Sequence, residues 1–137
     1  MPMCGGSGVI AIDTNVLVRL LVNDQPIQGK ASQKLFASED IFIPDTVLLE
    51  TEWVLRAAYG LGRIEVCAAF RRVCGLRNVA VSDGPLIAQV IDWHEAGFDF
   101  ADAFHLALSK GHDKLKTFDA GFIKQARKHT DRRVERP

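Results

Sequence analysis

The sequence predicts an α/β fold, a three-layer α/β/α sandwich around a central, mostly parallel sheet of four to five strands. Short apolar segments rich in β-branched residues alternate with longer amphipathic segments along the chain, a pattern typical of parallel sheets covered by helices on both faces. Proline, glycine and aspartate punctuate the boundaries between these segments. A length of 137 residues suits a single domain with one core.

The first part of the chain is expected to contain three strands and four helices. Pro26 and Pro44 stand where helices begin, and Gly60 stands where one ends. The expected elements are a strand at 9–12, helices at 15–22 and 26–38, a strand at 41–43, a helix from the 44–46 cap to about 59, a helix at 64–75 and a strand at 79–81.

The remainder of the chain continues the alternation. Pro85 begins a helix that Gly97 ends, and Asp99 caps the next helix. The expected elements are helices at 85–95 and from 99 to 111, a strand at 114–118, a helix at 121–129 and an edge strand near 134. Residues 1–8 are interpreted as a flexible leader or an expression remnant, and residues 9–137 as the single folded domain.

Composition excludes several classes of protein. The sequence is 47% hydrophobic and 25% charged, as in ordinary globular proteins, and 17 acidic residues balance 17 basic ones, so it is not a uniformly basic nucleic-acid binder. It has no apolar run long enough for a membrane helix and no secretory signal. Three cysteines without a Cys-x-x-Cys pair indicate a reducing, cytoplasmic location and no structural zinc.

Four carboxylates at the edges of apolar segments are the main functional signal: Asp13, Glu50, Asp102 and Asp119. An ionised acid drawn toward a core must find a partner or shift its pKa. Asp13 and Asp119 follow expected strands, and the carboxyl ends of parallel strands share one edge of a sheet. Carboxylates gathered there would repel one another unless a divalent cation neutralised them, and such a cation activates water and phosphoryl groups. The chemistry this suggests is phosphodiester hydrolysis.

Glu50 is expected on an apolar helix face that Trp53 and Val54 share. Glu52, in contrast, can pair with Arg56 at the i, i+4 spacing, where Glu50 has only Val54. The comparison favours Glu50 over Glu52 as the functional acid.

Helix capping is the simpler alternative for the aspartates. Asp13 can be an N-cap, although Thr14 or Asn15 can cap in its place, and Asp99 with Asp102 can form a pair like a capping box. These alternatives stay open from the sequence.

Asp119 can also be a cap, with the Thr117 hydroxyl placed to orient its carboxylate. His105 shares the face of Asp102, where a packed, hydrogen-bonded histidine is a simpler interpretation than a ligand. The basic residues near the C-terminus form either a solvated face or a contact with phosphates, and the candidates for an RNA contact are Lys128, Arg132 and Arg133.

Four segments carry a family resemblance: Ile-Asp-Thr-Asn-Val-Leu-Val-Arg-Leu-Leu (12–21), Leu-Leu-Glu-Thr-Glu-Trp-Val-Leu (48–55), Asp-Phe-Ala-Asp-Ala-Phe-His-Leu-Ala (99–107) and Thr-Phe-Asp (117–119). Together they resemble a PIN domain, and most of all the VapC-type toxin of bacterial toxin–antitoxin pairs. The resemblance implies that Asp13, Glu50, Asp102 and Asp119 bind metal and act in catalysis, with Asn15, Asp99 and Thr117 beside them.

The resemblance further implies an endoribonuclease that uses one or two Mg²⁺ or Mn²⁺ ions and forms a homodimer. A VapB-like antitoxin would neutralise it, and it would meet operator DNA only through the antitoxin complex. An RNA-processing or surveillance PIN nuclease, or an idle PIN scaffold that binds antitoxin and DNA, is the alternative. A haloacid-dehalogenase-type phosphatase is disfavoured because Asn15 occupies the third position of its Asp-x-Asp motif.

Overall fold

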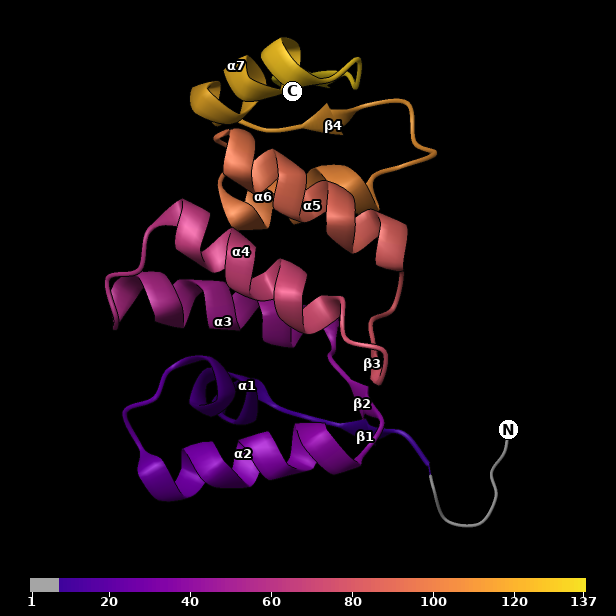
Figure 1. The fold of residues 1–137 in the computed structure, drawn as a ribbon. Helices are drawn as coiled ribbons and strands as arrows, with labels where there is room; N and C mark the ends of the chain where they lie inside the picture. The colour runs from indigo at the N-terminus through magenta and orange to yellow at the C-terminus, as the bar shows by residue number, and fades with distance from the viewer. Residues whose placement is uncertain (1–7) are drawn as a thin grey trace. The chain divides into compact units, whose positions relative to one another are not determined.

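The computed structural model describes residues 8–137 and confirms the expected α/β class with parallel strands. The expected leader, apart from Gly8, lies outside the described residues. The chain divides into two compact units, one ending at Gly84 (unit 1) and the other running from Pro85 to Pro137 (unit 2). Figure 1 shows the elements of each unit along the chain.

Unit 1 is built on three parallel strands in the order β1-β2-β3, which Figure 1 shows side by side. Ile10 pairs with Ile41, and Ile41 pairs with Val79. Each pair of strands is joined by helices, as parallel pairing requires. The elements are β1 (Ile10–Ala11), α1 (Thr14–Leu21), α2 (Pro26–Ser38), β2 (Ile41–Phe42), α3 (Asp45–Ala57), α4 (Arg63–Cys74) and β3 (Val79–Ala80).

The core of unit 1 is aliphatic, and α1 packs against both α2 and α3. Its fully buried side chains include Leu17, Ile41, Ile43, Leu48, Leu55 and Phe70. A polar triangle also holds α1 in place, because the Arg19 guanidinium donates to Asp24 at 2.6 Å and to the Tyr59 hydroxyl at 2.9 Å. That hydroxyl in turn donates to Asp24 at 2.8 Å. The triangle ties the start of α2 and the end of α3 to α1.

Unit 2 is more helical and has an aromatic core. Its elements are α5 (Gly84–Ala96, beginning at the last residue of unit 1), α6 (Phe100–Leu108), β4 (Leu115–Lys116), α7 (Ala120–His129) and β5 (Val134–Glu135), and β4 pairs with β5 in parallel. Phe98 packs on Trp93 and Phe122, and Phe100 packs on Phe104. The turn from α5 to α6 passes through Gly97 at a φ of 128°, a backbone conformation that only glycine adopts freely.

All of the expected helices and strands are present, with shorter strands than the sequence suggests. The five strands pair as one three-stranded and one two-stranded parallel sheet. Short ladders fit the sequence, because each strand is followed within a few residues by a proline, an aspartate or a glycine. Along residues 8–137, none of the helices combines the length and the apolar character that crossing a bilayer requires.

Candidate functional site

Three of the sequence-predicted acids cap helices at their N-termini. The carboxylates of Asp13, Asp99 and Asp119 accept hydrogen bonds from the backbone N–H three residues further on, at 3.2, 3.1 and 3.0 Å. The capping alternative is therefore confirmed, and Asp13 rather than Thr14 or Asn15 caps α1. Capping engages one oxygen of each carboxylate and fixes its direction, which leaves the second oxygen for another partner.

Glu50 lies on the solvent side of α3, which corrects the expectation of an apolar face. Its neighbour on that face, Trp53, is 58% exposed, whereas Glu52 is only 3% exposed. Glu50 has a partner within unit 1, since the Thr14 hydroxyl donates a hydrogen bond of 2.5 Å to Glu50 Oε1. This bond brings the Glu50 carboxylate to Thr14, the first residue of α1, which follows the N-cap Asp13.

The expected pairing of Glu52 with Arg56 is confirmed. Arg56 Nε donates to Glu52 Oε2 at 2.8 Å along one turn of α3. Glu52 is thus a buried carboxylate with a structural partner, and Glu50 is the exposed one. The choice of Glu50 over Glu52 as the functional acid stays a prediction.

Unit 2 gathers three carboxylates. Burial raises the pKa of Asp102, and the nearby charges of Asp99 and Asp119 raise it further, while His105 lowers it. Asp102 is half-buried and sits in the first turn of α6. His105 is exposed, so its interpretation as a packed core histidine is wrong. The smaller, electrostatic part of this rise in pKa is the repulsion expected between neighbouring carboxylates with no cation between them.

The surroundings of Asp119 show how it is held. Its backbone N–H donates to Thr117 Oγ1 at 3.1 Å, so the threonine fixes the backbone of Asp119. The sequence had suggested a different role for Thr117, that of orienting the carboxylate. A Cβ atom added at Gly121 would lie 3.2 Å from Asp119 Oδ1. Gly121 therefore leaves room for the carboxylate, a role that only the Asp-x-Gly spacing could have indicated.

Phe118 is a neighbour of this cluster that the sequence reasoning missed. Its ring is 76% exposed, although it directly precedes Asp119 at the end of the β4 segment. Exposed aromatic rings serve as stacking surfaces for nucleic-acid bases. The signal that could have identified Phe118 from the sequence is its position immediately before an aspartate at the end of a strand.

Oxygen donors of this kind suit a hard divalent cation, and the repulsion at Asp102 is what such a cation would relieve. The donor chemistry therefore fits Mg²⁺ or Mn²⁺. Within the portion of the chain that the structure covers, no group of three or more His, Cys, Asp or Glu side chains is arranged to hold a metal ion.

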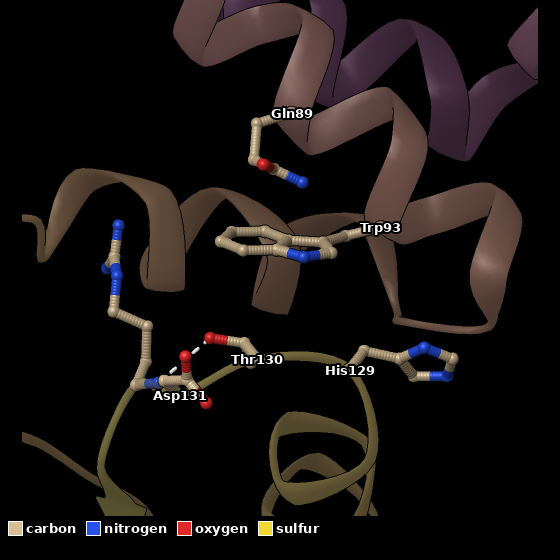
Figure 2. Close-up of a pocket in the computed structure, with 6 residues that line it drawn as sticks. Gln89, Trp93, His129, Thr130 and Asp131 are labelled. Atoms are coloured by element: carbon tan, nitrogen blue, oxygen red, sulfur yellow. Dashed lines mark hydrogen bonds between the residues drawn. The ribbon is translucent and has the colours of Figure 1, made fainter.

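Of the candidate RNA contacts, Arg132 is already engaged within unit 2. Its guanidinium donates to the Leu106 carbonyl at 2.7 Å and lies 5.9 Å from the centre of the Trp93 ring. Arg132 and Trp93 border a cavity of about 460 Å³, where Figure 2 shows the Trp93 ring between Gln89 and the segment that carries Thr130. Trp93 is only 8% exposed, so its ring serves packing.

Arg133 and Lys128 differ from Arg132. Arg133 lies 3.6 Å from a Glu135 carboxylate oxygen, in an exposed pair of the kind that contributes little to stability. Lys128 is exposed on α7. Both remain candidates from the sequence.

Comparison with known proteins identifies the family of the chain. The PIN domain family matches residues 10–128, a span that contains all four predicted acids and most of both units. The match confirms the PIN-like fold class that the four sequence segments indicated. No curated protein matches the sequence closely.

Proposed function

The chain belongs to the PIN domain family, a family of metal-dependent nucleases, and on that premise we propose that it is an endoribonuclease that acts as a VapC-type toxin. The observation that carries the nuclease proposal is the group of carboxylates in unit 2, where burial and then the charges of Asp99 and Asp119 raise the pKa of Asp102. Neighbouring acids that repel one another in the free protein are oxygen donors whose repulsion a bound divalent cation would relieve.

The residues proposed to hold Mg²⁺ or Mn²⁺, as one ion or two, are Asp13, Glu50, Asp102 and Asp119. When bound, such an ion polarises a phosphoryl oxygen and lowers the pKa of a water molecule. Within unit 1, the Thr14 hydroxyl holds the Glu50 carboxylate and the N-cap bond fixes Asp13. Within unit 2, Asp99 caps the helix that carries Asp102 and remains its acidic neighbour.

The toxin assignment rests on the resemblance of four segments, 12–21, 48–55, 99–107 and 117–119, which implies a homodimer, a VapB-like antitoxin and operator DNA bound through the antitoxin complex. An RNA-processing nuclease would keep the same acids. An idle scaffold would keep the fold and the partner without cleaving RNA.

Cleavage of total RNA with Mg²⁺, and with EDTA in its place, tests the nuclease. The key variant is Asp13→Asn, because asparagine caps a helix as well as aspartate does and only the negative charge is lost. Asp40→Asn is the matched control, since Asp40 is exposed outside the predicted site. We expect EDTA and Asp13→Asn to abolish cleavage and Asp40→Asn to preserve it. Cleavage by Asp13→Asn in EDTA would refute the proposal.

Expression in bacteria separates the toxin from a processing enzyme. The wild-type chain should arrest growth, Asp13→Asn should not, and coexpression of a small protein encoded beside the gene should restore growth. RNA cleavage in vitro without growth arrest would favour the processing nuclease, and neither cleavage nor arrest would favour the idle scaffold.

A further inference from the structure

A groove of about 440 Å³ runs along unit 2 between α7 and β5. On α7, its lining residues recur at i, i+3, i+4 and i+7, so they share one face of the helix. The residues that line it are Ala120, Ile123, Lys124, Arg127, Glu135 and Arg136. We call it the α7 groove.

The α7 groove carries unbalanced positive charge. Lys124, Arg127 and Arg136 are exposed, and within residues 8–137 their side chains form no hydrogen bond or ion pair. The single acid in the wall, Glu135, is already matched, because Lys116 Nζ lies 2.8 Å and Lys114 Nζ 3.4 Å from its Oε1. The three cations therefore face solvent without a counter-charge from the protein.

The position of the groove relates it to the proposed catalytic acids. Ala120, at one end of its lining, directly follows Asp119, the N-cap of α7. At the rise of an α-helix, Lys124 and Arg127 lie roughly 8 and 12 Å further along the axis than Asp119. Lys124 and Arg127 thus lead away from Asp119 along α7, and Ile123 contributes an apolar side chain to the same wall.

We propose that the α7 groove binds the phosphate backbone of the RNA strand next to the phosphodiester bond that is cleaved. The inference rests on the proposed nuclease function. A strand cleaved near Asp119 must continue away from it, and the exposed cations of the groove can pair with its phosphates. A groove of this kind binds single strands through their backbone, without selecting a sequence.

The test measures binding of a labelled single-stranded oligoribonucleotide in EDTA over a range of salt concentrations. The groove variant is Lys124→Gln/Arg127→Gln/Arg136→Gln. The control variant, Lys30→Gln/Lys34→Gln/Lys110→Gln, loses the same charge from exposed positions outside the groove. At about 0.7 per phosphate contact for single strands, the groove variant should lower the slope of log K against log salt by about 2. The control variant should keep the wild-type slope.

Equal slopes for the groove and control variants would overturn the inference. So would a glutamate-rich peptide that displaces the RNA from the wild type with higher affinity than an unlabelled oligoribonucleotide, since the groove would then fit an acidic protein segment. Thermal unfolding checks that both variants keep the fold.

Cleavage of the same RNA by the wild type with Mg²⁺ separates the two proposals. If the wild type cleaves RNA but the groove and control variants have equal salt slopes, the groove proposal is refuted and the nuclease proposal stands. A groove-dependent slope without cleavage supports the groove as an RNA site and refutes the nuclease. A wild type that neither binds nor cleaves RNA removes both.

Discussion

The Thr14 hydroxyl donates a hydrogen bond of 2.5 Å to Glu50 Oε1 and so connects residues 36 positions apart in the sequence. Thr14 is the first residue of α1 and Glu50 lies within α3. Because the side chain of Glu50 faces solvent, this bond is what restricts the orientation of an otherwise mobile carboxylate. Thr14 is therefore a positioning residue for Glu50.

Replacing Thr14 by valine should weaken Mn²⁺ binding about tenfold or more, since loss of a hydrogen bond that orients a ligand typically costs that much. Thr14→Ser keeps the hydroxyl and should restore the affinity. Isothermal calorimetry measures both, and thermal unfolding checks the fold. Equal Mn²⁺ affinity in Thr14→Val and Thr14→Ser would show that the hydroxyl does not position a metal ligand.

Glu50→Gln and Glu52→Gln should have opposite effects. Glu50→Gln should lower Mn²⁺ affinity with little change in stability, because Glu50 is exposed. Glu52→Gln should keep the affinity but reduce the free energy of unfolding by about 1–3 kcal/mol. Glu52 is only 3% exposed, and the substitution removes the charge from the carboxylate that accepts the hydrogen bond from Arg56. Calorimetry and urea unfolding measure the two quantities, and the reverse order of affinities would reassign the ligand to Glu52.

The raised pKa of Asp102 predicts that the stability of the metal-free protein depends on pH. Its pKa is raised in the folded state, so the folded state binds more protons than the unfolded state at pH values just above 3.8. Stability should therefore fall as pH rises from 3.8 through the raised pKa. Asp102→Asn cannot ionise and should lack this loss, so it should be the more stable protein at neutral pH.

Unfolding in EDTA at several pH values measures this difference, and cleavage assays should show Asp102→Asn to be inactive. Wild type and Asp102→Asn with the same pH dependence would contradict the raised pKa that burial and the charges of Asp99 and Asp119 give to Asp102.

Phe118→Ala should weaken binding of single-stranded RNA by roughly tenfold, since stacking of one base contributes about 1–3 kcal/mol. The side chain is 76% exposed, so its loss should leave the melting temperature nearly unchanged. Phe118→Trp offers a larger ring and should bind at least as tightly as the wild type. Fluorescence anisotropy in EDTA measures the affinities, and an alanine variant that binds like the wild type would exclude stacking at Phe118.

The helices and the aspartates were predictable because their signals are local. N-caps, prolines and glycines mark helix ends within a few residues, and Asp13, Asp99 and Asp119 are all caps as well as candidate site residues. The solvent face of α3 was not predictable, because that helix is apolar nearly all round and its periodicity does not select a buried side.

The choice among the C-terminal basic residues was likewise beyond the sequence. A run of basic residues has no fixed orientation until the neighbouring elements are in place. Arg132 turns onto Trp93 and the Leu106 carbonyl, residues 39 and 26 positions away, whereas Lys124 and Arg127 share an open helix face. Contacts at such separations leave no mark on local composition.

The caps at Asp13 and Asp119 bear on how such a chain is inactivated by mutation. An aspartate codon becomes an asparagine codon by a single nucleotide substitution, and asparagine starts a helix equally well. Such a mutation removes the negative charge at these positions and keeps the hydrogen bond that starts each helix, so charge and fold can be lost independently.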